Sequence, residues 1–302
     1  MKFNVAELRR SRKDDMSMVG VTRELLVRTV DTWAPGNLHA AHGATFLHAS
    51  GNGIDHAAAE GAVRAFAEFG DRLRGRLTLL FVAPGVQALQ PRVQEIQREL
   101  RTPPEMAVHV VPGGNVAAVL KAAGAGAGPL LAVIDETVDK NLSAAAVLLT
   151  APAGTWGAQR AELRRAGLEL TAGVELVDGA DELLVGFGTR SAKSLEAFKS
   201  ELWALDEYAG VRYRDPQDPE GHLMDISLEP NPGALRREIL QELRGGGMTV
   251  TELKRFALTD TVYRAADAQK VVTALLHAGA VTRSPEGGRL GGDVVISLTT
   301  GG

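Results

Sequence analysis

The sequence contains no cysteine among its 302 residues. This absence excludes disulfides, cysteine-ligated zinc, iron–sulfur clusters and a thiol nucleophile. No apolar run approaches the roughly 20 residues of a membrane-spanning helix. The charged start MKFNVAELRRSRKDD lacks the apolar core of a secretory signal. We therefore expect a cytoplasmic protein that does not contact a membrane.

Neither sign of charge dominates the chain. Its 33 Lys and Arg against 37 Asp and Glu give a net charge of −4, so no uniformly basic surface points to nucleic acid or an anionic membrane. Hydrophobic residues make up 45% of the sequence, which is ordinary for a globular protein and excludes disorder. The length predicts two domains, or one large and one small.

Short apolar runs alternate with helical stretches from residue 44 onward. The runs occupy residues 45–49, 77–83, 108–111, 130–135 and 146–150, and the helical stretches occupy residues 55–74, 87–100 and 116–123. Unbroken apolar runs are typical of strands buried on both faces, and their alternation with helices predicts parallel βαβ units. An N-terminal helix over residues 21–33, ended by Ala34-Pro35-Gly36, precedes them. The pattern predicts an α/β, Rossmann-like fold.

The sheet is expected to close with an antiparallel pair. Two more strand-like runs, residues 170–177 and 182–188, are separated only by Asp178-Gly179-Ala180-Asp181, which is too short for a crossover helix. A mostly parallel sheet with a closing antiparallel hairpin is the methyltransferase-type Rossmann pattern. A helix over residues 194–205 and a polar loop over residues 213–221 follow.

The C-terminal part has a different pattern. Helices are expected over residues 235–243, 249–258 and 265–277, with Thr249 as an N-cap, and strands over residues 280–283 and 294–298. Three helices and a β-hairpin predict a winged helix-turn-helix. We thus expect an N-terminal helical segment (residues 1–43), a Rossmann-like methyltransferase-fold domain (44–225) and a winged-helix domain (230–302).

A candidate ligand loop follows the first strand of the predicted sheet. Ser50, Gly51, Asn52 and Gly53 stand between this strand and a helix, where small residues let backbone N–H groups approach a ligand. His56 occupies the position of the third glycine of a dinucleotide motif. A tight turn without a ligand therefore remains an equal alternative.

Carboxylates are scarce where adenosyl and nucleotide cofactors are held. Such sites place an acid at the end of the second strand, but this chain has Ala83-Pro84 there. Asn115, after the third strand, offers an amide instead. Asp135 and Glu136 end the fourth strand, and they could hold a metal or act as a base. We favour the alternative in which Asp135 caps the following loop and Glu136 is solvated.

A metal site is not expected. His39, His42, His48 and His56 fall close together in the sequence, but glycines and a strand separate them, so convergence of three ligands is unsupported. We interpret them as loop and turn histidines.

Residues 230–302 hold nine Lys and Arg against seven Asp and Glu. The candidates for nucleic-acid contact are Arg255, Arg264, Lys270, Arg283 and Arg289, on or near the third helix and the hairpin. Asp260 and Asp267 lie near the same helix and would oppose phosphate. DNA binding and protein binding both remain open for this domain.

The order of these parts resembles the bacterial three-Cys-motif partner proteins, which are similar to S-adenosylmethionine-dependent methyltransferases in fold. The stretch Leu47–Gly53 is similar to the family's Asp-Gly-Phe-Ala-Gly-Pro-Gly loop, and residues 195–206 to its Phe-Lys-x-x-Met-Trp-x-x-Asp segment. Thr261-Val262-Tyr263-Arg264 is similar to its C-terminal helical region. The likeness spans most of the chain.

The departures from that family concern its acids. Leu47, Ala83 and Gly114 stand where the resemblance implies acids, and only Asp135 is kept. Each lost carboxylate–hydroxyl hydrogen bond would cost about 1.5–3 kcal/mol. The resemblance therefore implies a degenerate relative with no bound cofactor.

We expect a non-catalytic protein that binds a protein partner or regulates one. One alternative is an active S-adenosylmethionine-dependent methyltransferase that uses Gly51, Gly53 and Asp135. Another is a DNA-binding regulator whose Rossmann-like domain senses a ligand.

Overall fold

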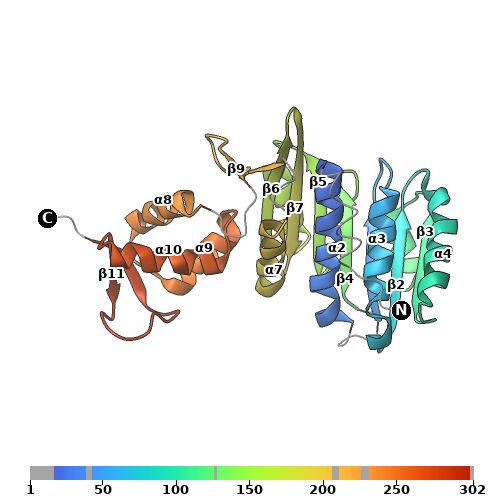
Figure 1. Cartoon of the computed structure of the whole chain (residues 1–302), viewed down its shortest axis with the longest axis horizontal. Coiled ribbons are helices and arrows are strands. Elements are labelled where there is room, and N and C mark those ends of the chain that lie inside the picture. Colours follow the sequence, from blue (N-terminus) through green and yellow to red (C-terminus); the bar gives the residue numbers. More distant parts are fainter. Residues whose placement is uncertain (1–16, 39–42, 126–127, 206–210, 226–230, 300–302) are drawn as a thin grey trace. The chain divides into compact units, whose positions relative to one another are not determined.

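A computed structural model of the chain describes residues 17–38, 43–125, 128–205, 211–225 and 231–299. The chain divides into two compact units, Met1–Ile226 and Ser227–Gly302. Each unit has its own sheet and its own helices (Figure 1).

The first unit is built on a nine-stranded mixed sheet with the order β3-β2-β1-β4-β5-β7-β6-β8-β9. Five parallel strands form one part: β1 (Gly43–Ala49), β2 (Arg76–Val82), β3 (Met106–Val111), β4 (Leu130–Asp135) and β5 (Ala146–Pro152). The rest pair antiparallel: β6 (Leu170–Asp178), β7 (Asp181–Thr189), β8 (Arg212–Arg214) and β9 (Leu223–Asp225). The predicted α/β class and the mixed sheet are confirmed.

Helices cover both faces of this sheet. On one face α2 packs between α3 and α7, and α3 also packs against α4 (Figure 1). On the other face, apolar residues of α5 and α6 join strand residues in one buried cluster. The bounds are α2 (Met18–Asn37), α3 (His56–Ala67), α4 (Leu89–Leu100), α5 (Val116–Ala122), α6 (Trp156–Arg165) and α7 (Ala192–Trp203), with short 3-10 turns at Gly70–Arg72 and Val86–Ala88. Both faces of β1, β2, β4 and β5 are therefore largely buried, as their unbroken apolar runs predict. The edge strand β3 is mostly half-buried, and its His109 is exposed.

Two sequence-based boundaries are wrong for physical reasons. Helix α2 continues through Pro35 instead of ending before it, because a proline so close to the C-terminus removes only one hydrogen bond of the helix. Buried Trp33 and Ala34 hold this last turn in place. The helix expected over residues 55–74 ends at Ala67, and a separate 3-10 turn follows.

The polar loop expected over residues 213–221 is also wrong at its start. Tyr213 lies in β8, pairs with Leu176 and is fully buried. Its hydroxyl donates to the carbonyl oxygen of Leu202 at 2.5 Å. Burial of a large aromatic side chain outweighs the polar character of its neighbours, so the chain extends the sheet here.

A pair of glycines makes room for helix α6, which the sequence reading missed. Gly173 of β6 and Gly186 of β7 face each other, and the indole of buried Trp156 packs over both. A Cβ on Gly173 would lie 2.5 Å from the indole ring, and one on Gly186 would lie 3.1 Å from it. The glycines thus allow Trp156, the first residue of α6, to pack against the β6–β7 hairpin.

The second unit contains α8 (Gly233–Glu242), α9 (Val250–Asp260) and α10 (Ala265–His277) with a small antiparallel sheet. Its strands are β10 (Met248–Thr249), β11 (Val281–Ser284) and β12 (Val295–Leu298), in the order β10-β12-β11. Strand β10 is an addition to the expected hairpin. Thr249 caps α9 as predicted, and Glu252 completes a capping box with it.

Within the described residues, no helix is long and apolar enough to cross a membrane.

Substitution Gly173→Ala should destabilise the first unit by about 1–3 kcal/mol, because its methyl group would overlap the Trp156 ring. Gly157→Ala is the matched control, since Gly157 lies in α6 itself with open space around its Cβ position. It should stabilise by about 0.5–1 kcal/mol. Urea unfolding monitored by tryptophan fluorescence checks both; equal effects of the two substitutions would contradict this packing.

Candidate functional site

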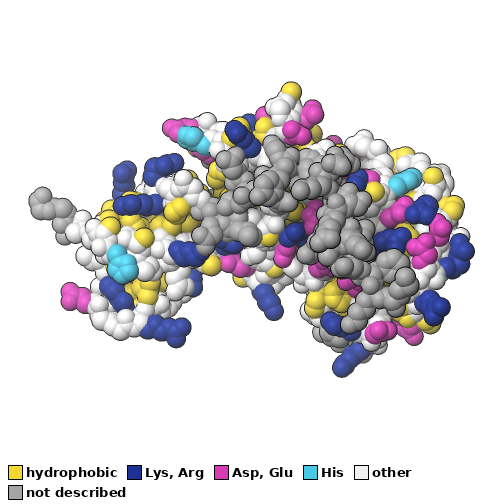
Figure 2. Space-filling model, in the orientation of Figure 1, with side chains coloured by type: hydrophobic (Ala, Val, Ile, Leu, Met, Phe, Trp, Pro, Cys, Tyr) yellow, Lys and Arg dark blue, Asp and Glu magenta, His cyan; other side chains and the backbone are white. Residues whose placement is uncertain are grey.

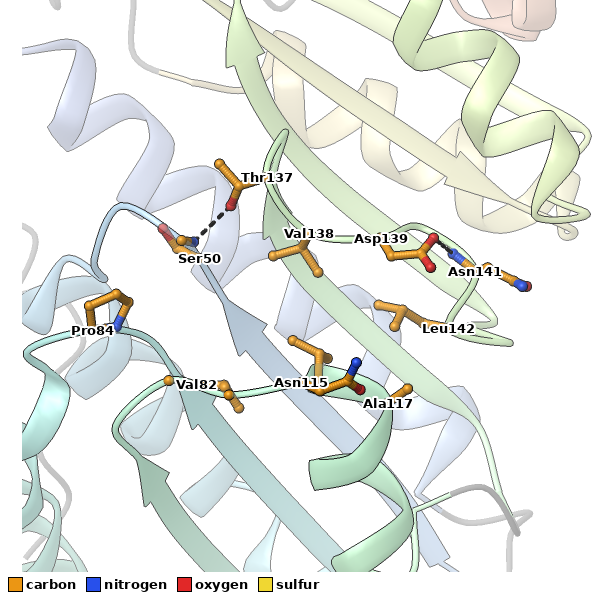
Figure 3. A pocket seen from close by; sticks show the side chains of 14 residues that line it. Ser50, Val82, Pro84, Asn115, Ala117, Thr137, Val138, Asp139, Asn141 and Leu142 are labelled. Carbon is orange, nitrogen blue, oxygen red and sulfur yellow. Dashed lines mark hydrogen bonds between the residues drawn. The ribbon is translucent and has the colours of Figure 1, made fainter.

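The carboxyl ends of β1, β2, β3 and β4 meet at one edge of the sheet and surround a cavity (Figure 3). Its volume is about 370 Å³, within the range of small-molecule sites. Open α/β sheets bind ligands at this edge. The lining residues are Ser50, Gly51, Val82, Pro84, Gly113, Gly114, Asn115, Val116, Ala117, Thr137, Val138, Asp139, Asn141 and Leu142.

The loop after β1 uses its backbone donors within the chain. The N–H of Gly51 donates to Oγ1 of Thr137 at 2.8 Å (Figure 3), and the N–H of Asn52 donates to Oγ of Ser50 at 3.0 Å. These are the groups that a nucleotide-binding loop would direct at a ligand. In this protein they are already paired.

The carboxylate of Asp135 ties this loop to the segment after β4. Its Oδ2 accepts from Oγ of Ser50 at 2.6 Å and from Nδ2 of Asn52 at 3.4 Å. Its Oδ1 accepts from the N–H of Thr137 at 3.0 Å and from the hydroxyl of the same residue. Asp135 therefore holds two loops together, and we call Ser50, Gly51, Asn52, Asp135 and Thr137 the Asp135 clasp.

The ionisation of Asp135 follows from these bonds. Burial would raise the pKa of its carboxyl, but hydrogen bonds from Ser50 and Thr137 outweigh burial and lower the pKa below the ordinary value. A carboxylate saturated with donors and held in the charged form is a poor general base.

Gly51 and Gly53 are glycine for different structural reasons. A Cβ on Gly51 would lie 2.5 Å from Oγ1 of Thr137, so this glycine permits a contact within the protein. Gly53 has open space at its Cβ position but a φ of +105°, which favours glycine for backbone reasons.

The residues that line the cavity after β2 and β3 carry no charge. Ala83, directly after β2, is fully buried and has no hydrogen-bonding side chain. Asn115, after β3, caps α5: its Oδ1 accepts from the N–H of Ala118 at 3.0 Å. Asp139 is the acid among the lining residues, and its Oδ1 accepts from the N–H of Asn141 at 2.9 Å (Figure 3).

Of the ligand candidates predicted from the sequence, Ser50, Gly51 and Asn115 line the cavity. Asn52, Gly53 and Asp135 lie outside its lining, and Glu136 is exposed beside a second hollow next to Lys140 and Glu162. The sequence did not point to Thr137, Val138, Asp139, Asn141 and Leu142, which form one wall. Their signal was the polar run Thr137, Asp139 and Asn141 directly after a strand end.

The histidines do not form a metal site in the described part of the chain, where no group of three or more His, Asp or Glu side chains converges. His39 and His42 lie outside the described residues. His56 begins α3, and His48 lies within β1 rather than in a loop.

His48 is a neutral base packed between aromatic rings. Its ring neighbours are Phe46 and Phe81, and its Nδ1 is buried with no hydrogen-bond partner among the described residues. Burial lowers the pKa of this imidazole to about 4, although Asp55 and Asp135 act in the opposite direction.

The nucleic-acid candidates differ in how they are held. The guanidinium of Arg264 pairs with Asp267 at 2.8 and 2.9 Å, and that of Arg283 donates to four backbone carbonyls of residues 285–289. These two arginines therefore organise the second unit. The side chains of Arg255, Lys270 and Arg289 are exposed.

Comparison with known proteins yields no matching family model, and no curated protein matches the chain.

Substitution Gly51→Ala should lower the free energy of unfolding by about 1–3 kcal/mol, because the new methyl group would overlap Thr137. In a Thr137→Gly background the same change should cost much less. Chemical denaturation of all four proteins gives the coupling energy; additive effects would contradict the clasp.

His48 should make the first unit sensitive to acid. The pKa of this imidazole is 6.5 in the unfolded chain and about 4 in the folded protein, so acid protonates the unfolded chain first. The folded state therefore keeps its full stability above pH 6.5 and loses part of it as the pH falls toward 4. The loss is about 3 kcal/mol. Between pH 7 and pH 4, the free energy of unfolding should fall more steeply with decreasing pH in the wild type than in His48→Gln. Chemical denaturation at several pH values measures this, and parallel pH profiles would contradict the assignment.

Proposed function

We propose that the first unit has a methyltransferase-type fold and that the chain is a degenerate relative of the three-Cys-motif partner proteins. The strand order β3-β2-β1-β4-β5-β7-β6 supports this, because parallel strands are followed by an antiparallel β6–β7 hairpin on the β5 side. Strands β8 and β9 add to that edge.

The residues at the sheet edge do not fit S-adenosylmethionine. Its ribose hydroxyls need an acceptor at the end of β2, and Ala83 supplies none. Its charged amino-acid part needs free backbone donors and acceptors near the loop after β1. There the N–H groups of Gly51 and Asn52 are paired internally, and the Asp135 carboxylate already accepts from three residues.

A non-catalytic role in binding or regulating a protein partner is the function that this arrangement supports best. The observation that carries it is the Asp135 clasp, in which the hydrogen-bond donors of the loop are paired within the protein and are not directed at a ligand. Opening the clasp to admit a cofactor would leave a buried carboxylate without its partners, at a cost of about 1–3 kcal/mol for each lost bond.

For the second unit we propose a winged-helix architecture. The element order α8, β10, α9, α10, β11, β12 and the three-stranded sheet β10-β12-β11 support it. Four residues, 261–264, connect α9 to α10, which is the turn length of a helix-turn-helix.

Calorimetric titration of the full chain with S-adenosylmethionine and with S-adenosylhomocysteine tests the first proposal. We expect no heat of binding up to millimolar ligand. Micromolar binding that Gly53→Val abolishes would overturn the proposal and would favour an active methyltransferase. Because Gly53→Val is strained, its melting temperature must be measured alongside.

A further inference from the structure

Helix α10 presents an outward face of uncharged or cationic side chains. Its inner face is buried through Ala268, Val271, Val272 and Leu275, in helical spacing. The exposed or half-buried positions are Ala265, Ala266, Gln269, Lys270, Thr273, Ala274, Leu276 and His277. No carboxylate stands among them.

Of the two acids expected to oppose phosphate, Asp267 is turned inward, whereas Asp260, the last residue of α9, is exposed. Asp267 is 7% exposed and is paired with Arg264 through both oxygens. It also accepts from the backbone N–H of Arg264 at 3.1 Å, which closes the start of α10. The negative charge at this helix is therefore neutralised before any ligand approaches.

The loop between β11 and β12 borders the same surface. A groove of about 500 Å³ is lined by Thr273 and His277 from α10 and by Arg283, Glu286 and Leu290 from β11 and the loop. Arg283 holds the loop by donating to the carbonyl oxygens of residues 285, 287, 288 and 289. The exposed Arg289 therefore lies beside α10, on a loop that the hydrogen bonds of Arg283 hold in place.

Positive charge gathers on this unit. Residues 230–302 carry nine Lys and Arg against seven Asp and Glu. Dark-blue side chains outnumber magenta ones on the face of the unit seen in Figure 2. Of the acids, Asp267 is committed to Arg264, and Glu252 accepts from the backbone and hydroxyl of Thr249.

We propose that the outward face of α10 binds the major groove of duplex DNA, with Arg289 directed to phosphates. Glutamine, lysine and threonine are side chains that read base edges, and small residues such as Ala274 let a helix approach them closely. The inference is independent of the proposed function of the sheet edge, because it involves no residue of the first unit.

The test is fluorescence anisotropy of the full chain with a labelled 30-base-pair duplex of mixed sequence. We expect a dissociation constant of about 1–100 µM at physiological salt, weakening as salt rises. Ala274→Glu places a carboxylate on the outward face and should weaken binding at least about tenfold. Arg289→Ala removes a phosphate contact and should reduce the slope of log affinity against log salt by about 1.

Two controls separate this surface from general electrostatics. Ala274→Gln has nearly the size of the Glu variant without its charge and should bind within about threefold of the wild type. Lys193→Ala changes the net charge by the same amount as Ala274→Glu, at an exposed position on α7 of the first unit, and should bind like the wild type. Circular dichroism and melting temperatures confirm that each variant folds.

Failure to bind duplex DNA even at 50 mM salt would overturn the proposal and leave protein binding for this unit. Equal loss in Ala274→Glu and Lys193→Ala would also overturn it, because binding would then follow net charge and not the α10 face. Equal affinity for single-stranded DNA of the same sequence would exclude major-groove recognition.

Discussion

The carboxylate of Asp135 is the constraint on which the candidate site depends. It ends a fully buried strand at the centre of the sheet, so burial alone would disfavour its charge. Hydrogen bonds from Ser50, Asn52 and Thr137 compensate that cost and, in doing so, position two loops from neighbouring strands. The shape of the cavity beside them follows from this arrangement, because Ser50, Gly51 and Thr137 all contribute to its wall.

The contacts around Asp135 also show which of two roles the glycine-containing loop has. Such a loop can bring its N–H groups to an anion, or it can let another part of the protein come close. At Gly51 the second use is realised, because Thr137 occupies the space that a side chain would need and accepts the N–H. A glycine in this position is therefore no evidence of a ligand unless the contacts around it are known.

The second unit handles charge in a similar way. Arg264 and Arg283 look like surface cations in the sequence, but one neutralises a buried acid and the other satisfies four carbonyls. Because these arginines are paired within the unit, the charge of the outward face of α10 differs from the net charge of the unit. The location of a charge, more than the sum of charges, decides what such a surface can bind.

The sequence by itself determined the α/β class, the parallel strands, the antiparallel β6–β7 pair and the Thr249 cap, because unbroken apolar runs, short links and capping residues act locally. Only the tertiary structure decided the rest. Tyr213 became a strand residue and Pro35 stayed within a helix because burial against distant residues outweighed local preference. The partners of Gly51, Asp135 and Asp267 were likewise decided in three dimensions, since hydrogen bonds between separate loops, and the inward turn of an acid, leave no periodicity in the chain.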